Sequence, residues 1–140
     1  MGPTVTFASW SLELTDGGNP SFSVRAASNM LVTTTDLLHV ITDGAWHHLV
    51  GVRDIQAKQL ILYLDGAQAA VAPLSGHQLD QLANTDGEVD PVTIGASRVA
   101  NAATYVDYLP GANDKVAYFG AAISADQVQA IYAAPDGECH

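Results

Sequence analysis

The fold is decided by the stretch Asp43-Gly44-Ala45-Trp46-His47-His48-Leu49-Val50-Gly51-Val52-Arg53-Asp54, followed shortly by Leu60-Ile61-Leu62-Tyr63-Leu64-Asp65-Gly66. Both parts are apolar runs of strand length, and Asp-Gly turn signals flank them. This pattern predicts two consecutive antiparallel strands, over residues 46–53 and 59–65. The chain should therefore be built on a central β-hairpin.

Alternation of apolar and polar residues predicts further strands on both sides of this hairpin. Residues 9–14 and 21–26 alternate with period two around a turn cluster at 15–20, so they predict a second hairpin. In the first strand Trp10, Leu12 and Leu14 should point inward, and in the second strand the inward residues are Phe22, Val24 and Ala26. Shorter strands are expected over residues 30–35, 37–42, 67–72, 92–95 and 115–119.

One helix is expected near the end of the chain. Ser124 is a favourable N-cap, and Gln127 three residues later completes a capping box. Val128, Ile131 and Tyr132 fall on one face, which should pack against the sheets. The turn residues 135–137 should end the helix.

The same segments resemble, in order, the motifs of laminin G-like domains of the concanavalin A-like lectin/glucanase superfamily. The stretch "DG-x-WHH-x-V-G-x-R" leading into "L-Y-x-DG" looks like the hallmark of these domains. Residues 92–98 are similar to the family's "V-x-I-G" strand, 111–116 to its "G-x-I-D-x-V" strand except at Asn113, and 122–132 to its closing "A-L-S-x-x-x-I-x-x-L-Y".

The resemblance runs from about residue 9 to residue 132. It implies an all-β fold, an antiparallel β-sandwich of the concanavalin A-like, jelly-roll type with one short C-terminal helix. We expect a single domain over residues 1–140, in which the family's usual opening strands are missing or shortened. The 48% of hydrophobic residues can fill one core.

The charge balance excludes several classes of partner. Fifteen acidic residues against five basic ones give a formal net charge of -10, so nucleic acid and anionic lipid surfaces would be repelled. No segment approaches the roughly 20 apolar residues of a membrane helix, so membrane insertion is not expected. Divalent cations would be attracted.

The location expected from the sequence is extracellular. Cys139 is the single cysteine, so no internal disulfide can form. The first residues do not look like a signal peptide. We therefore expect a mature form or a piece of a larger secreted protein.

Periodicity disappears over residues 73–91, which predicts a long polar and acidic connection, and again over a second irregular stretch, residues 97–110. Carbohydrate is the ligand expected at this second stretch. Tyr105 and Tyr108 can stack on the apolar face of a sugar, while Asn101 and Arg98 can bond its hydroxyl groups together with Asp107. The alternative is that the two tyrosines only pin the loop to the sheet.

A structural calcium ion is the expected cofactor. The resemblance implies a carboxylate ligand at Asp114, although a carboxylate bonded to loop amides beside Gly111 fits equally well. Asp86, Glu88 and Asp90 present oxygens at every second position, which is typical of the start of an EF-hand loop. However, the closing bidentate Glu of such a loop is absent, and a solvated acidic loop explains these residues too.

The histidines favour a structural role. His47 and His48 alternate on their strand, and the resemblance implies a histidine that bonds across strands. A glycosidase of this superfamily would show two or three carboxylates alternating along one strand. The most similar stretch is Glu88-Val89-Asp90, which lacks a third acid and is followed by Pro91, a residue that interrupts strand pairing. We therefore expect a protein that is not an enzyme.

Three functions follow from these observations. The first is a non-catalytic extracellular binding or adhesion module with a glycan ligand. The second is an assembly domain of a larger secreted or virion-surface protein, which binds protein, a complementing segment or a second copy along an open sheet edge. The third is a remnant of a polysaccharide-degrading enzyme whose catalytic strand lies elsewhere.

Overall fold

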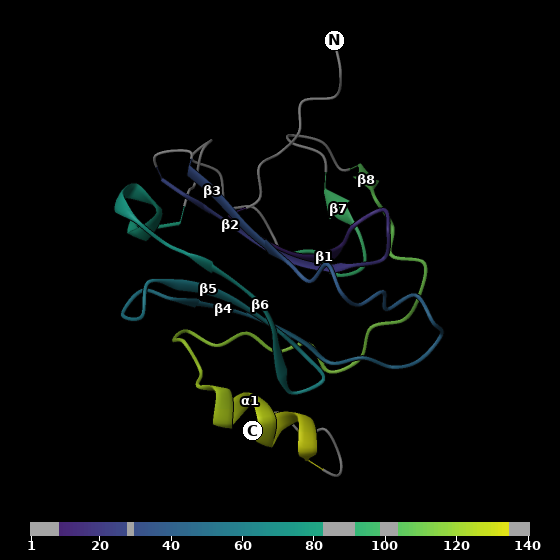
Figure 1. The fold of residues 1–140 in the computed structure, drawn as a ribbon. Coiled ribbons are helices and arrows are strands. Elements are labelled where there is room, and N and C mark those ends of the chain that lie inside the picture. The colour runs from purple at the N-terminus through teal and green to yellow at the C-terminus, as the bar shows by residue number, and fades with distance from the viewer. Residues whose placement is uncertain (1–8, 28–29, 83–91, 99–103, 135–140) are drawn as a thin grey trace.

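A computed structural model describes residues 9–27, 30–82, 92–98 and 104–134 (Figure 1). Its first sheet has the strand order β1-β2-β3, and its second sheet has the order β4-β5-β6. A short hairpin, β7-β8, stands apart from them. The bounds of the elements are β1 Trp10–Leu14, β2 Pro20–Ala26, β3 Met30–Thr35, β4 Leu49–Asp54, β5 Gln59–Leu64, β6 Ala67–Pro73, η1 Gly76–Leu79, β7 Ser97–Arg98, β8 Tyr105–Val106 and α1 Ala125–Ala133.

Both sheets are antiparallel meanders, as the alternating sequence predicts. In the first sheet Leu12 lies opposite Phe22, and Phe22 lies opposite Thr34. In the second sheet Gly51 lies opposite Leu62, with Ala70 on the far side. The two predicted hairpins are therefore confirmed, and so are the strands at 30–35 and 67–72.

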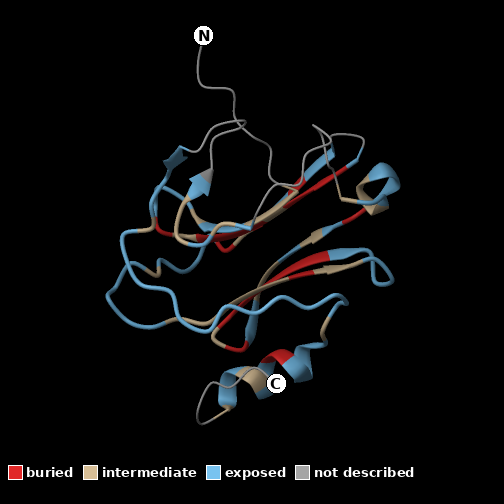
Figure 2. Cartoon of the chain, turned by 180° about the vertical axis from the view of Figure 1, so that it is seen from behind, coloured by how far each residue is buried: buried red, intermediate tan, exposed pale blue. Residues whose placement is uncertain are grey.

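The two sheets face each other across one hydrophobic core. Phe22, Val24 and Val32 of the first sheet form a buried cluster with Leu60 and Leu62 of the second. The inward direction predicted for Phe22, Val24 and Ala26 is confirmed, because all three are buried. Trp10 packs against the same cluster from β1, whereas Leu12 remains partly open to solvent. Figure 2 shows buried residues on both sheets.

Gly51 lets the sheets approach closely. A Cβ atom at Gly51 would lie 2.5 Å from the ring of Phe22 on the opposite sheet. Carbon atoms that are not bonded to each other essentially never come that close. The Phe22 ring therefore occupies the space that a side chain at residue 51 would need. The fold is therefore the predicted antiparallel β-sandwich.

Helix α1 covers the outer face of the second sheet (Figures 1 and 2). Val128 is fully buried and joins a second cluster with Val52, Ile61 and Tyr63. The helix begins as predicted: the Gln127 N–H donates to Ser124 Oγ at 3.2 Å, and the Ser124 N–H donates to the Gln127 side-chain oxygen at 2.7 Å. It ends at Ala133, while the predicted stop at 135–137 lies outside the described residues.

The strand predicted over 37–42 is wrong. Buried Asp36 folds this segment into a loop, because its Oδ1 accepts hydrogen bonds from the N–H groups of Leu38 and His39. The Asn19 side chain donates to the His39 carbonyl at 2.8 Å, and the Ile41 N–H donates to the Gly18 carbonyl at 3.0 Å. The loop is thus tied to the β1-β2 turn.

One confirmed strand starts later than predicted, and two other predicted strands are wrong. The first strand of the central hairpin begins at Leu49 and not at residue 46, because Asp43 and His47 close a turn before it. Residues 92–95 are not a strand: Gly95 has φ of 82°, and pairing starts only at Ser97. Residues 115–119 are not a strand either, and Lys115 has φ of 54°, outside the extended region.

The described part of the long connection predicted over 73–91 begins with a short 3-10 helix, η1. The Arg53 guanidinium donates to the carbonyl groups of Gln78 and Asp80 around it. Burial lowers the pKa of Arg53, an effect that the nearby Asp80 carboxylate opposes. This contact ties the connection back to strand β4.

Candidate functional site

The predicted ligand-binding tyrosines lie on one small, closed loop. We call residues 104–108, with strand β8 inside them, the tyrosine loop. Arg98 of β7 pairs with Tyr105 of β8. Asp107 takes a left-handed conformation with φ of 53°, and the Leu109 N–H donates to the Gly95 carbonyl at 2.7 Å. The loop is therefore held at both ends by backbone hydrogen bonds.

Both tyrosine rings of this loop face solvent. Tyr105 is 44% exposed and Tyr108 is 70% exposed. These exposures leave both rings accessible to a ligand, and the ligand-binding role of the two tyrosines stays a prediction. Of the other two predicted ligand-binding residues, Arg98 is placed by its backbone pairing with Tyr105, and Asn101 lies outside the described residues.

A carboxylate from a distant part of the sequence lies within electrostatic range of Asp107 in the tyrosine loop. The pKa of Glu13, on strand β1, is raised first by burial and then by the negative charge of Asp107. The tyrosine loop therefore lies near the edge of the first sheet. Glu13 was not among the predicted site residues, and no local signal marks it, because only the tertiary fold brings β1 to residue 107.

The most highly connected polar cluster lies elsewhere, around His47. Its Nδ1 lies 2.8 Å from Asp65 Oδ2, and its Nε2 lies 3.0 Å from Asp43 Oδ1. Asp65 also accepts the His48 N–H at 2.8 Å through Oδ1. These hydrogen bonds raise the pKa of His47, the contact with Asp65 contributing most. The cluster clamps the start of β4 to the β5-β6 turn, which agrees with the predicted bonding of a histidine across strands.

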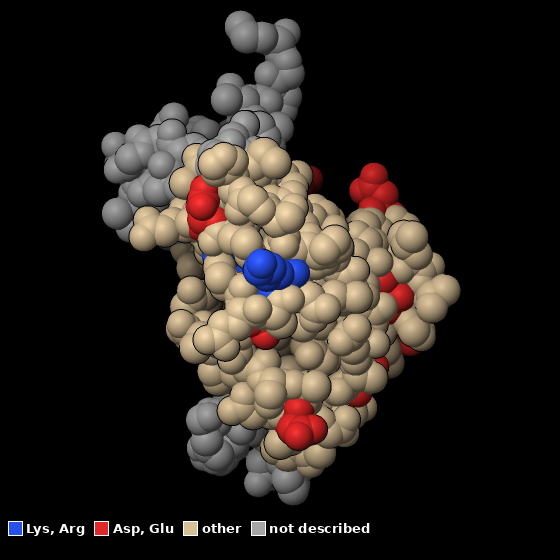
Figure 3. All heavy atoms as spheres, turned by 60° about the vertical axis from the view of Figure 1, so that its left-hand side comes forward, with Lys and Arg blue, Asp and Glu red and all other residues tan. Residues whose placement is uncertain are grey.

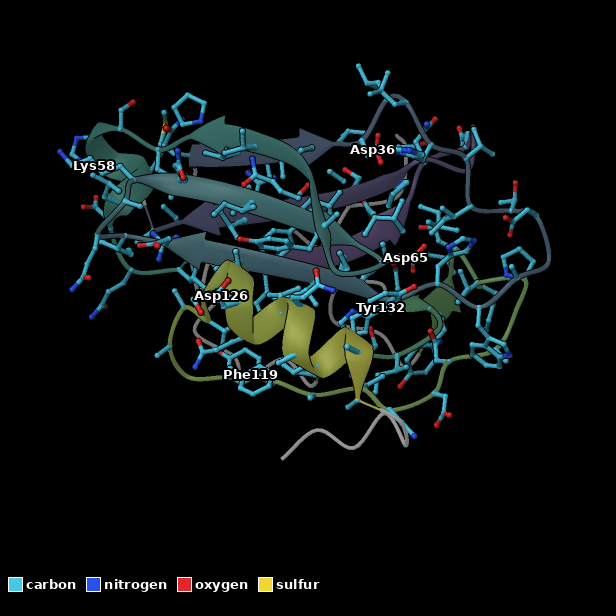
Figure 4. The ribbon with its side chains drawn as sticks, turned by 60° about the horizontal axis from the view of Figure 1, so that its bottom comes forward. Asp36, Lys58, Asp65, Phe119, Asp126 and Tyr132 are labelled. Carbon is cyan, nitrogen blue, oxygen red and sulfur yellow. The ribbon has the colours of Figure 1, made fainter. Side chains whose placement is uncertain are left out.

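His48 belongs to the contact with the helix. Its ring centroid lies 5.9 Å from that of Tyr132, and burial lowers the pKa of His48. A Cβ atom at Gly66 would lie 2.8 Å from the Tyr132 ring. Figure 4 places Tyr132 beside Asp65 at one end of α1, with Asp126 and Phe119 toward the other end. His48 therefore joins the second sheet to helix α1, whereas His47 acts within the sheet.

The candidate metal ligands do not converge in the described structure. Asp114 is exposed, and the described residues hold no group of three or more His, Cys, Asp or Glu side chains that fits a metal ion. Asp86, Glu88 and Asp90 lie outside the described residues. Since calcium takes about six to eight oxygen ligands, the described residues around Asp114 do not fit the ion by themselves, and calcium binding stays a prediction.

The fold defines a class of protein, namely antiparallel β-sandwiches of the concanavalin A-like type. The chain belongs to the concanavalin A-like lectin/glucanases superfamily, because the family model Laminin_G_3 of that superfamily matches residues 2–129. The predicted kinship is thereby confirmed.

A solved structure shares this fold. It is the 2.1 Å crystal structure of residues 221–444 of an S-layer domain-containing protein from Clostridium thermocellum, with a TM-score of 0.50 and 22% sequence identity. The similarity covers 83% of this chain and 52% of that one, so the chain spans about half the length of its neighbour. None of the curated proteins matches the chain. No helix among the described residues is long and apolar enough to cross a membrane.

Proposed function

We propose that this domain is a non-catalytic extracellular recognition module that binds carbohydrate through the tyrosine loop. The observation that carries the proposal is the exposure of Tyr105 and Tyr108 on a loop closed by backbone hydrogen bonds. Exposed aromatic rings on a segment held by backbone hydrogen bonds can stack on the apolar face of a sugar ring.

The carboxylates beside the rings supply the polar part of the site. Asp107 lies between the two tyrosines in the sequence, and Glu13 lies near it. Carboxylate oxygens accept hydrogen bonds from sugar hydroxyl groups. Because this pair is negative and the whole chain carries a net charge of -10, we expect neutral glycans to bind better than sulfated or uronic acid polymers.

Membership of the superfamily supports an extracellular, non-catalytic role, although fold alone does not fix function. The solved neighbour is described as an S-layer domain-containing protein, and a cell-surface setting would suit a glycan-binding domain. The third function considered above, a remnant of a polysaccharide-degrading enzyme, has no described arrangement of side chains in its favour.

A glycan array followed by isothermal titration calorimetry tests the proposal. Tyr105→Ala and Tyr108→Ala should each weaken binding of the best neutral glycan by about tenfold, equivalent to about 1.4 kcal/mol, through lost stacking. Tyr108→Phe keeps the ring and should retain most of the affinity. Leu37→Ala changes an exposed apolar residue on another loop; it is the control and should bind like the wild type.

Two results would overturn the carbohydrate proposal. One is an array on which no glycan binds. The other is a glycan that binds the double variant Tyr105→Ala, Tyr108→Ala as tightly as the wild type. Release of reducing ends from any polysaccharide during the titration would overturn the non-catalytic part.

A second function, assembly with protein, is favoured by a different observation. Leu37 and Leu38 are 81% and 86% exposed, although Asp36 and Asn19 hold their loop in place. Large apolar side chains on a fixed loop are typical of protein contacts. Size-exclusion chromatography with light scattering tests self-association, and a strictly monomeric chain would leave only a different protein as the partner.

A further inference from the structure

Helix α1 is attached to the second sheet at its middle and at one end. In the middle, Val128 inserts among Val52, Ile61 and Tyr63. At the end, the ring of Tyr132 lies against the sheet. Among the described residues, the core cluster between the two sheets contains no residue of the helix. Because a nine-residue helix is barely stable by itself, it can leave the sandwich without opening that core.

The attachment at the end of the helix depends on a histidine with one unsatisfied ring nitrogen. The Nδ1 of His48 is buried and has no hydrogen-bond partner among the described residues, and the ring packs against Tyr132. A neutral imidazole can carry its proton on Nε2, which leaves Nδ1 as an acceptor only, whereas an imidazolium carries a proton on both nitrogens. Protonation of His48 in the docked state would therefore create a buried donor without an acceptor.

The charged groups around His48 do not supply that acceptor. Asp65, on the β5-β6 turn, accepts the backbone N–H of His48 through Oδ1 and contacts His47 Nδ1 through Oδ2, both at 2.8 Å. Asp126 lies toward the far end of the helix (Figure 4), and the helix end beside Tyr132 carries only a partial negative charge. The charge of Asp65 favours a protonated His48, but burial has the larger effect and lowers the pKa of His48.

His47 takes up its proton before His48 as the pH falls. The pKa of His47 is raised, with the hydrogen bond to Asp65 as the largest cause, whereas burial lowers the pKa of His48. When His48 is protonated, Asp65 is therefore already paired with an imidazolium at His47. The nearest carboxylate cannot turn toward His48 without breaking that pair.

We propose that acidification releases helix α1 from the outer face of the second sheet, with His48 as the sensor. Docking has its full strength above about pH 6.5, the ordinary pKa of histidine. It weakens as the pH falls below that value, because His48 takes up a proton more readily when the helix is undocked. Release would uncover the apolar cluster of Val52, Ile61 and Tyr63.

The net charge of the chain works against release and cannot be its cause. Figure 3 shows one face on which acidic side chains are spread and basic ones occupy a small area. Since the formal net charge is -10 with neutral histidines, protonation of histidines lowers the overall repulsion and favours the compact form. A loss of docking in mild acid would therefore come from a local group.

This inference is independent of carbohydrate binding and of assembly. The test is amide hydrogen exchange of the whole chain by NMR, corrected for intrinsic rates, from about pH 7.5 to about pH 5, where ordinary carboxylates stay ionised. Protection of the amides in residues 128–133 should fall about tenfold and follow the titration of the His48 ring signals. Protection in β2 should fall less, because global unfolding also breaks the His47 contacts, which acid strengthens.

His48→Phe keeps an aromatic ring against Tyr132 without a titrating group, so its helix should stay protected at the acidic end of the series. His48→Leu is a second test in case the first variant does not fold. His77→Phe is the matched control: it makes the same substitution at an exposed histidine of η1 and should lose helix protection like the wild type.

Two results would overturn the inference. One is a wild type whose helix keeps its protection throughout the series, whether or not the His48 ring has titrated. The other is an equal loss of protection in a folded His48 variant, which would assign the pH response to a different group.

Discussion

Two neighbouring histidines in this chain have opposite electrostatic surroundings. His47 contacts carboxylates through both ring nitrogens, which requires a proton on each and favours the imidazolium form. His48 packs against Tyr132 and has a buried Nδ1 with no described hydrogen-bond partner, which favours the neutral form. The two neighbouring histidines therefore have different roles: His47 joins β4 to the β5-β6 turn, and His48 packs against the helix.

The His47 clamp should make stability depend on pH. The pKa of His47 is raised in the folded state above its usual value of about 6.5. Its stabilising effect is therefore complete below about pH 6.5 and is lost as the pH rises through the folded-state pKa. We expect the loss of unfolding free energy caused by His47→Asn, measured by urea unfolding, to shrink as the pH is raised.

The control for this prediction is His77→Asn. His77 also contacts a carboxylate, Asp80, but both side chains are largely exposed, and such pairs contribute little to stability. This variant should resemble the wild type across the whole pH range. If the destabilisation by His47→Asn instead stays constant or grows toward alkaline pH, the clamp does not depend on the charged imidazole.

At the scale of elements, helix α1 depends on its cap and on one buried side chain. The helix has nine residues, and helices this short are barely stable in isolation. Its stability in the protein comes from the capping box at Ser124 and from Val128, which inserts among Val52, Ile61 and Tyr63. The cap could be read from the sequence because both partners are three residues apart.

Removing the cap should destabilise the protein measurably. Ser124→Ala leaves one N–H at the start of the helix without its acceptor, and the expected cost is about 1 kcal/mol of unfolding free energy. Urea unfolding followed by circular dichroism measures this difference. Ser124→Asp restores an acceptor and should recover most of the loss. Equal stability of Ser124→Ala and the wild type would show that water replaces the cap at no cost.

The strands also show where local patterns succeed. The alternation in β2 and the apolar run in β5 predict strands correctly, because one or both faces of each strand are buried in the core. The 37–42 segment has equally suitable residues, yet Asp36 competes for its backbone N–H groups and turns the chain. Local propensity alone could not reveal that competition, because the turn is also fixed by Asn19 from another element.

At the scale of the whole molecule, the distance between the two sheets depends on Gly51. Gly51→Ala places a methyl group against the Phe22 ring, and overpacking of this kind costs about 1 to 3 kcal/mol. The melting temperature should fall, as measured by differential scanning calorimetry. Gly111→Ala is the matched control, since no atom outside the adjacent residues lies within 4 Å of its added Cβ. Equal losses in both variants would mean that the effect is not due to sheet packing.

The candidate site was only partly predictable. Tyr105 and Tyr108 could be found from the sequence, because aromatic residues in an irregular polar stretch stand out. The exposure of their rings could not be predicted from the sequence, since it depends on which surfaces the fold leaves uncovered. No sequence pattern marks Glu13 as a site residue, because only the fold brings it within electrostatic range of Asp107. Trp46 was expected to begin a strand, and the structure leaves its side chain exposed.

The sequence by itself determined the central hairpins, the capped helix and the lectin-like kinship. These features depend on contacts between residues that are close along the chain or on motifs that can be compared directly. The tertiary structure alone decided the packing of Phe22 on Gly51, the packing of Tyr132 on His48, and the tie of Arg53 to the carbonyl groups of Gln78 and Asp80. These contacts join segments far apart in the sequence, and their energies exist only once both sheets have come together.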